Sequence, residues 1–286
     1  MITLGIDCGT QSLKTVALDG DSGQILASAS KPYGLIEGLP AGHAEQDPQI
    51  WWDALRETVG KVLSDLGSRK SEVGGIGISG QQHGFVPLDA NHQVIRPAKL
   101  WCDTSTTAQC DEIRAKLGGR EKTIALAGND ILPGFTAPKI LWLKRNRPDI
   151  YRNTRKIVTS TSYLVYRLTG ALVVDHYTAA NTGPIYDVEN RCFSDALTRD
   201  IIDLDRLPDL LWTTEIAGTV TQEAAEATGL AAGTPVICGT ADAAAEAISV
   251  GVLDAGDMMM MYGSTVFIIG LAAKRARDQR LGYAPW

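Results

Sequence analysis

The chain lacks the features of several protein classes. Its five cysteines contain no CxxC pair, and His43, His92 and His176 show no metal-ligand spacing, which argues against a disulfide framework and a zinc site. No apolar run approaches the roughly 20 residues of a membrane-spanning helix, and no targeting segment opens the chain. A formal net charge of -6 gives no reason to expect nucleic acid or an anionic membrane. We expect a cytoplasmic globular protein that binds a small molecule. The sequence is compatible with a homodimer.

The strongest pattern lies in the first twenty residues. Apolar stretches at 2–8 and 13–19 flank a turn made of Gly9, Thr10, Gln11 and Ser12. Such a turn leaves backbone N–H groups close together, and glycine lets a ligand approach them. Asp7 precedes the turn, where a divalent cation bridging two phosphates would be met. The pattern fits a metal-bound nucleotide, and the alternative is an ordinary tight hairpin.

Strands and helices alternate along the rest of the chain. Three antiparallel strands are predicted at 2–8, 13–19 and 24–30, unlike a Rossmann start. Asp47 with Pro48, and Gly67, mark the two ends of a first helix. Further strands are expected at 73–79, near 156–159 and at 235–239, and further helices near 103–117, 137–145, 160–168, 221–228 and 243–250. This mixture predicts an α/β fold.

The opening pattern returns after Val252. Apolar strands predicted at 258–262 and 266–271 flank a second small-residue turn, Gly263-Ser264-Thr265. Two such hairpins indicate related half-molecules facing a common phosphate site. We therefore expect one domain at 1–250, followed at 251–286 by the beginning of a second, incomplete domain.

A glycine-rich stretch at 75–80 matches the dinucleotide fingerprint G-x-G-x-x-G. That fingerprint must open a helix, and Gly84 and Pro87 oppose one here, so a packed central strand is predicted. Gln82 and His83 follow this strand, where an amide and an imidazole can hold sugar hydroxyls. The alternative is a histidine satisfied within its own turn.

Two more candidates follow apolar strands. Trp101 and Asp103 place an aromatic face beside a carboxylate, a common carbohydrate site, although Asp103 fits equally well as the N-cap of the next helix. Asp242 follows a buried strand and opens an alanine-rich helix, where a carboxylate can accept a proton from a substrate hydroxyl. Helix capping is the alternative for Asp242 as well.

Taken in order, these motifs resemble the FGGY carbohydrate kinases, a branch of the actin and hexokinase superfamily, and within them the xylulokinases. The matching segments are Gly5 to Ser12, Gly80 to Gly84, Leu100 to Asp103, Gly134 to Lys139, Tyr163 to Gly170, Gly239 to Asp242, and Gly263 to Thr265. The resemblance implies a ribonuclease-H-like domain, with a second such domain closing over ATP.

The resemblance also implies roles for single residues. Asp242 would be the catalytic base, and Asp7 would lie near Mg²⁺ and contact it through water. Gln82 and His83 would contact the sugar. The first phosphate loop would comprise Gly9, Thr10, Gln11 and Ser12, and the second would include Gly263, Ser264 and Thr265.

The expected reaction is the ATP-dependent phosphorylation of a ketopentose, D-xylulose, to xylulose 5-phosphate. Xylulokinases usually carry asparagine directly after the catalytic aspartate, and Ala243 stands there, which leaves ribulose or a glycerol-like polyol open. Because the family is normally much longer, we expect most of the adenine lobe beyond Trp286 and this chain alone to be inactive. The alternative from another class is an actin-like or chaperone-like ATP-binding protein without a sugar site. A dehydrogenase comes third.

Overall fold

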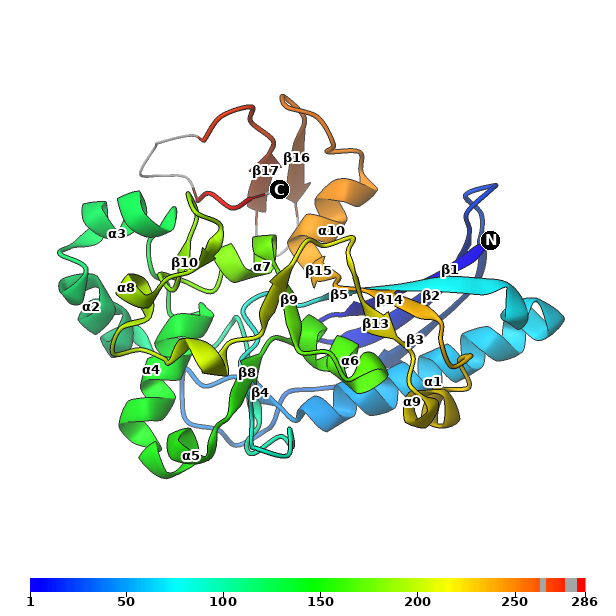
Figure 1. Cartoon of the computed structure of the whole chain (residues 1–286), viewed down its shortest axis with the longest axis horizontal. Coiled ribbons are helices and arrows are strands. Elements are labelled where there is room, and N and C mark those ends of the chain that lie inside the picture. The colour runs from blue at the N-terminus through cyan, green and yellow to red at the C-terminus, as the bar shows by residue number, and fades with distance from the viewer. Residues whose placement is uncertain (263–265, 276–281, 286) are drawn as a thin grey trace.

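A seven-stranded sheet forms the centre of the fold (Figure 1). The computed structural model describes residues 1–262, 266–275 and 282–285. The strands run in the order β13-β14-β5-β1-β2-β3, and β15 also pairs with β5. Their bounds are β1 Ile2–Cys8, β2 Ser12–Asp19, β3 Ile25–Pro32, β5 Val73–Gly80, β13 Ile216–Thr219, β14 Pro235–Ile237 and β15 Thr240–Ala241. The predicted α/β class and the three antiparallel opening strands are confirmed.

Three parallel strands end at the same edge of this sheet. β1 pairs with β5 so that Asp7 lies opposite Ser79 and Cys8 opposite Gly80. β15 pairs with the same end of β5, with Ala241 opposite Gly80. The carboxyl ends of parallel strands gather ligands in open α/β sheets, so this edge brings together the segments that follow β1, β5 and β15.

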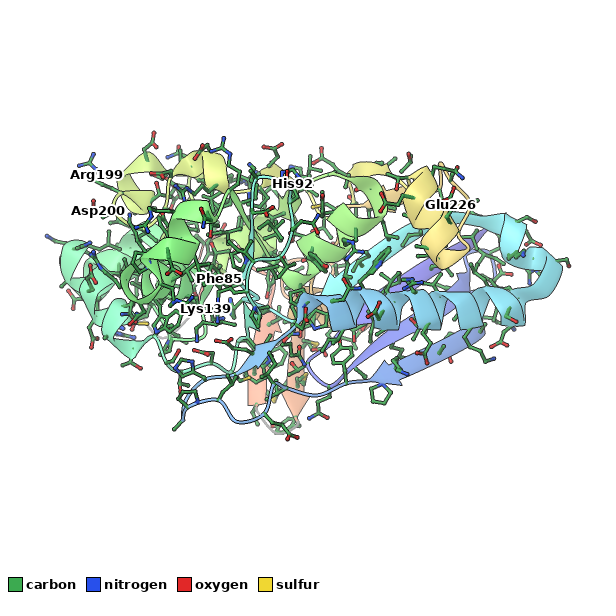
Figure 2. All side chains as sticks on the ribbon, turned by 90° about the horizontal axis from the view of Figure 1, so that it is seen from below. Phe85, His92, Lys139, Arg199, Asp200 and Glu226 are labelled. Carbon is green, nitrogen blue, oxygen red and sulfur yellow. The ribbon has the colours of Figure 1, made fainter. Side chains whose placement is uncertain are left out.

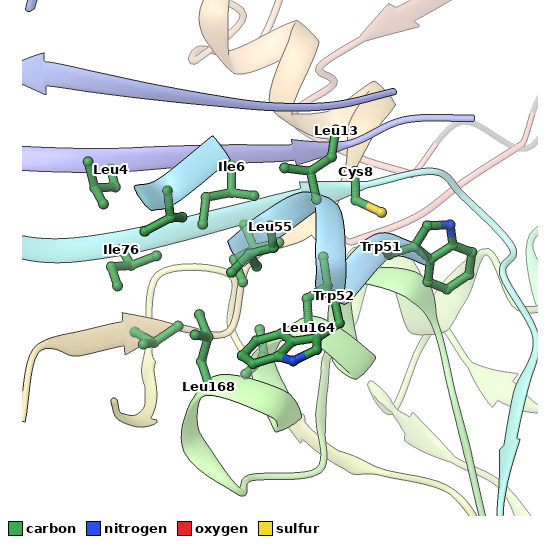
Figure 3. Packing of buried hydrophobic residues seen from close by; sticks show 14 of the residues in the cluster. Leu4, Ile6, Cys8, Leu13, Trp51, Trp52, Leu55, Ile76, Leu164 and Leu168 are labelled. Atoms are coloured by element: carbon green, nitrogen blue, oxygen red, sulfur yellow. The ribbon is translucent and has the colours of Figure 1, made fainter. Parts of the chain in front are cut away.

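Helix α1 (Pro48–Leu66) covers one face of the sheet. The Asp47 side chain accepts a hydrogen bond from the Gln49 backbone N–H, and Gly67 ends the helix at φ 58°, as predicted. Figure 3 shows side chains of α1, such as Leu55, packed between the sheet and α6 (Ser160–Thr169). Each fully buried leucine contributes roughly 1.5–3 kcal/mol to this packing.

A second group of elements lies beside the sheet and packs on its own apolar cluster around Phe85 and Ile140. Its helices are α2 Thr107–Lys116, α3 Arg120–Ala127, α4 Thr136–Asn146, α5 Pro148–Asn153, α7 His176–Ala180 and α8 Asp195–Thr198. Short strand pairs join these helices: β4 Glu45–Gln46 with β7 Ala98–Lys99, β6 Val86–Leu88 with β8 Lys156–Val158, β9 Val173–Asp175 with β12 Asp209–Leu211, and β10 Tyr186–Asp187 with β11 Cys192–Phe193. The chain also contains two short 3-10 helices, Gly67–Glu72 and Leu204–Arg206.

Several boundaries differ from the sequence prediction. The helix expected near 103–117 begins at Thr107, and its N-cap is Thr106 rather than Asp103. Besides the predicted helix, which is α9 (Gln222–Thr228), the segment 204–230 contains the strands β12 and β13, which the sequence did not predict. β13 is a short edge strand, and short strands carry little periodic signal.

The last described elements are helix α10 (Asp242–Ser249) and an antiparallel hairpin. The hairpin pairs β16 (Met258–Tyr262) with β17 (Val266–Gly270), as predicted. The turn between them, Gly263-Ser264-Thr265, was predicted as the second phosphate loop and lies outside the described residues. Within the described part of the chain, every helix is too short or too polar to cross a bilayer.

Candidate active site at the ends of β1, β5 and β15

Asp242 is the first residue of α10 and lies where β15 ends. Its Oδ1 accepts a hydrogen bond of 2.9 Å from the Ala243 backbone N–H. Burial raises the pKa of Asp242 to about 6, and the negative charges of Asp7 and Glu246 act in the same direction. The backbone N–H groups of Ala243 and Gln82 oppose this rise. The result is a carboxylate that is ionised at neutral pH and basic enough to accept a proton.

Asp7 and Glu246 add two further carboxylates to the same edge. Asp7 Oδ1 accepts a hydrogen bond of 2.9 Å from the Ser79 hydroxyl, and burial nevertheless raises the pKa of Asp7. Burial and the charge of Asp7 raise the pKa of Glu246. Sequence reasoning missed Glu246, although its position four residues after Asp242 places both on one helix face. The charge of Asp7 thus raises the pKa values of Asp242 and Glu246 across this edge, and the charge of Glu246 also raises the pKa of Asp242.

In the turn after β1, the backbone carbonyl oxygens are hydrogen-bonded within the protein, and some of the backbone N–H groups are not. Gly9 O accepts from the Tyr33 hydroxyl at 2.7 Å, Thr10 O from Gln46 Nε2 at 2.8 Å, and Gln11 O from the Tyr33 backbone N–H at 2.9 Å. Among the described residues, the N–H groups of Thr10 and Gln11 have no protein acceptor. Adjacent unpaired N–H groups form an anion-binding concavity.

Glycine at position 9 has a structural reason of its own. The Gly9 N–H donates to Ser12 O at 3.0 Å, which closes the turn. A Cβ on Gly9 would lie 3.2 Å from the same oxygen. The tight hairpin that the sequence offered as the alternative is therefore present, and its closure leaves the N–H groups of Thr10 and Gln11 without an acceptor among the described residues.

A buried pair of glutamines connects this turn to the end of β5. Gln46 Oε1 accepts from Trp51 Nε1 at 3.0 Å and from Gln81 Nε2 at 3.1 Å. The Thr10 hydroxyl donates to Gln81 Oε1 at 3.3 Å. Sequence reasoning missed the role of Gln46, because its partners come from distant segments and no local pattern marks it.

Gln82, His83 and Trp101 line up on the other side of Thr10. Gln82 Nε2 donates to the Tyr177 hydroxyl at 3.2 Å, and the Trp101 indole N–H donates to the Thr10 hydroxyl at 2.9 Å. Trp101 is 44% exposed, so much of its ring is open to a ligand. Of the predicted sugar-binding residues, Trp101 is thus hydrogen-bonded to the predicted phosphate turn, through Thr10.

Asp103 occupies a different environment from the one predicted. It is fully buried, and its oxygens accept from Lys99 Nζ at 2.8 Å, the Ala44 N–H at 3.0 Å, and both the N–H and the hydroxyl of Ser105 at 3.0 and 2.6 Å. The predicted N-cap role is wrong, because the chain runs three residues further before α2 begins. Asp103 would have to leave all four partners to bind a sugar, so its visible role is to fix the loop that carries Trp101.

One group of three ligand types within the described residues has metal-like spacing: His43, Glu45 and Asp103. Lys99 Nζ lies 3.2 Å from His43 Nδ1, 3.2 Å from Glu45 Oε1 and 2.8 Å from Asp103 Oδ2. The Lys99 ammonium thus contacts both carboxylates of this cluster. Arg96 Nη2 also lies 2.5 Å from Glu45 Oε1, so the group forms an ion network with two cations.

A cavity of about 660 Å³ opens elsewhere, between the start of α1, α6 and the loop 92–97. Its lining contains none of the predicted site residues and mixes Arg96 and Arg167 with Asp47 and Glu223. Mixed charge of this kind favours no single class of ligand.

Comparison with known proteins identifies the family. Residues 2–249 match the family model described as the FGGY family of carbohydrate kinases, N-terminal domain. The chain is 33% identical over 275 residues to xylulose kinase of Bacillus subtilis (strain 168), covering 96% of this chain and 54% of that protein. It is 36% identical over 263 residues to xylulose kinase of Escherichia coli (strain K12), covering 92% and 52%. The chain spans about half the length of the curated relatives it matches.

Solved structures agree with this assignment. The structure of xylulose kinase from Rhodospirillum rubrum superposes with a TM-score of 0.94 at 30% identity, covering 99% of this chain and 57% of that one. Glycerol kinase from Plasmodium falciparum, solved with ADP, superposes at 0.84 with 23% identity and covers 93% and 53%, which supports the fold alone. The expected actin- and hexokinase-like fold is confirmed. The chain belongs to the FGGY family of carbohydrate kinases, and residues 2–249 correspond to the N-terminal domain of that family.

Proposed function

We propose that this chain provides the sugar-binding and catalytic part of an ATP-dependent kinase that converts D-xylulose to xylulose 5-phosphate. The observation that carries the proposal is the position of Asp242: a carboxylate with a pKa of about 6 at the edge where β1, β5 and β15 end, beside the anion-binding turn. The names of the relatives support the choice of sugar.

Asp242 acts as the general base. At neutral pH it is ionised, and it takes the proton of the terminal sugar hydroxyl as that oxygen forms a bond to the γ-phosphorus of ATP. The bond from this phosphorus to the bridging oxygen breaks, and ADP leaves with the electron pair. Phosphoryl transfer depends on positioning and charge stabilisation more than on covalent chemistry. A base whose pKa lies near the working pH is effective in such a step.

The residues around Asp242 hold the two substrates. The N–H groups of Thr10 and Gln11, with Gly9 and Ser12 in the same turn, bind phosphate oxygens. Asp7 would hold Mg²⁺ through water, and the ion would supply positive charge to the phosphate oxygens. Gly263, Ser264 and Thr265, which lie outside the described residues, are proposed to bind phosphate as well.

Gln82 and His83 bind the sugar hydroxyls, and Trp101 covers one face of the sugar. Burial and the nearby charge of Lys139 lower the pKa of His83 to about 3. One ring nitrogen of the neutral imidazole bonds to the Asn181 backbone, and the other is left for a sugar hydroxyl. Asp103 contributes through the loop of Trp101 rather than by direct contact.

The proposed domain boundary lies near residue 250, with the sugar-binding domain at 1–250 and a nucleotide-binding domain beginning at 251–286. The end of the family match at residue 249 supports this division. Five free cysteines fit a reducing cytoplasm.

The test is a panel of ketoses and polyols assayed for ADP formation with the full-length protein, ATP and Mg²⁺. D-Xylulose is expected to give the highest kcat/KM. A preference for ribulose or glycerol would assign a different substrate, which the alanine at position 243 leaves room for. ATP turnover that no sugar stimulates would refute the kinase proposal and favour an actin-like or chaperone-like ATPase.

A further inference from the structure

Lys139 is a buried cation beside the sugar-binding residues that the mechanism above does not use. It lies near the start of α4 and is labelled in Figure 2. Its side chain is completely buried. A lysine in such a position needs partners that compensate for the loss of water, and those partners identify its role.

The Lys139 ammonium holds two segments together. Nζ donates to the backbone carbonyl of His83 at 2.7 Å and to that of Gly134 at 2.5 Å. His83 belongs to the turn that follows β5, whereas Gly134 belongs to the loop that precedes α4. The Lys139 amino group therefore links the His83 turn to the Gly134 loop, which no strand pairing joins.

The loop of Trp101 is part of the same assembly. A Cβ placed on Gly134 would lie 2.3 Å from the backbone oxygen of Trp101, so the two backbones are in direct contact. Phe135, the next residue, stacks on the His83 ring with 4.5 Å between ring centroids. All three loops around the proposed sugar site thus meet at Lys139 and its immediate partners.

The His83 turn needs such support because its backbone is strained. His83 has φ 59°, a left-handed conformation that is unfavourable for residues other than glycine. The surrounding contacts must hold it there. The hydrogen bond from Lys139 to the His83 carbonyl does so directly.

Lys139 also affects the pKa of His83. Burial and the positive charge of Lys139 lower the pKa of His83 to about 3, and only the backbone of Asn181 opposes them. Around Lys139 itself, burial lowers its pKa to about 7, Lys99 acts in the same direction, and Asp103 and Cys102 oppose. The His83 imidazole is therefore neutral at physiological pH.

We infer that Lys139 is a positioning residue of the sugar site: it holds the His83 turn and the Gly134 loop at the spacing that receives the sugar hydroxyls. This inference rests on the proposed sugar-kinase function. It gives a role to the segment Gly134 to Lys139, which the family resemblance includes without assigning one.

The test compares Lys139→Met with Lys144→Met in the full-length protein. Methionine nearly matches the length of the lysine stem but lacks the charge and donors. Lys144 is the matched control, since it lies on the same helix and donates to the backbone carbonyl of Asp200 at 3.0 Å, away from the site. Lys139→Met is expected to raise the KM for D-xylulose roughly tenfold or more, because charged hydrogen bonds are lost, with the KM for ATP unchanged. Lys144→Met is expected to leave both constants unchanged.

A sugar KM within twofold of the wild-type value in a folded Lys139→Met protein would overturn the inference. Parallel rises in the KM values for sugar and ATP would also overturn it, because they would indicate general loosening. If the methionine variant does not fold, Lys139→Gln, which keeps one donor, is measured instead against the same criteria.

An NMR titration of the His83 imidazole separates this inference from the proposed function, since it needs no turnover. In the wild-type protein the imidazole is expected to stay neutral from pH 8 to pH 5, and in Lys139→Met its pKa is expected to rise. An unchanged His83 titration in the variant would contradict the position of the Lys139 charge beside the His83 turn. Absence of sugar phosphorylation by the wild-type protein would refute the proposed function instead.

Discussion

Replacing Asp242 by asparagine is expected to make the protein more stable at neutral pH. Burial and the charges of Asp7 and Glu246 raise the pKa of Asp242 from 3.8 to about 6. Between these two pH values the folded state binds more protons than the unfolded state, so the free energy of unfolding falls as pH rises. Above pH 6 the full cost of the ionised carboxylate is present. Asparagine removes this charge and keeps an oxygen for the Ala243 N–H.

The magnitude follows from the pKa. A rise of about two pKa units corresponds to about 3 kcal/mol, and solvent at this partly exposed carboxyl reduces it to about 2 kcal/mol. For a domain of this size, that is an increase in Tm of about 4–8 °C at pH 7.5. At pH 4.5 the gain should fall to about one third, because the folded carboxyl is then largely protonated and only the ionisation of the unfolded state, with its pKa of 3.8, still contributes.

The assay is thermal unfolding of the wild-type protein and Asp242→Asn at pH 7.5 and pH 4.5. Asp195→Asn is the matched control, because Asp195 also opens a helix, α8, but is exposed and away from the site. Its replacement is expected to leave Tm unchanged or slightly lower, since it loses a favourable helix-terminus interaction. An Asp242→Asn protein no more stable than the wild type at pH 7.5, or a gain that does not depend on pH, would refute the reasoning.

Three further results are expected. Gln46→Leu should lower the free energy of unfolding by about 2–4 kcal/mol in urea titrations, because buried partners including Thr10 O and Trp51 Nε1 lose their hydrogen bonds; a loss below about 1 kcal/mol would contradict this network. Gly239→Ala should cost at least about 2 kcal/mol by the same assay, since Gly239 has φ 74° and a Cβ would lie 2.2 Å from Ile78 O; a neutral effect would show that the turn relaxes. The kcat of the wild-type protein should fall about tenfold per pH unit below about pH 6 as Asp242 takes up a proton, and a flat profile down to pH 5 would exclude a base with this pKa.

Local signals in the sequence were sufficient for much of the fold. Both ends of the first helix could be predicted, because the capping residues Asp47 and Gly67 directly flank it in the sequence. The opening strands could be predicted because apolar stretches flank a glycine-led turn. The edge strand β13 could not, because its four residues, Ile216–Thr219, carry no alternation distinct from a loop.

The candidate site shows the same division between local and distant signals. Asp7 and Asp242 could be selected from the residues around them. The burial of Asp103 could not, because its partners Lys99 and Ala44 are brought to it by the pairing of β4 with β7. The contact of Lys139 with His83 joins residues 56 positions apart. Such contacts depend on the tertiary structure, and a single sequence does not record them.

The most direct test of the account is the turnover of D-xylulose by Asp242→Asn in the full-length protein at saturating ATP and Mg²⁺. If Asp242 is the base, kcat falls by a factor of roughly 10² or more, while the KM for the sugar changes little and the fold remains intact. Near-normal turnover by a folded Asp242→Asn protein would contradict the central claim and remove Asp242 from the role of base.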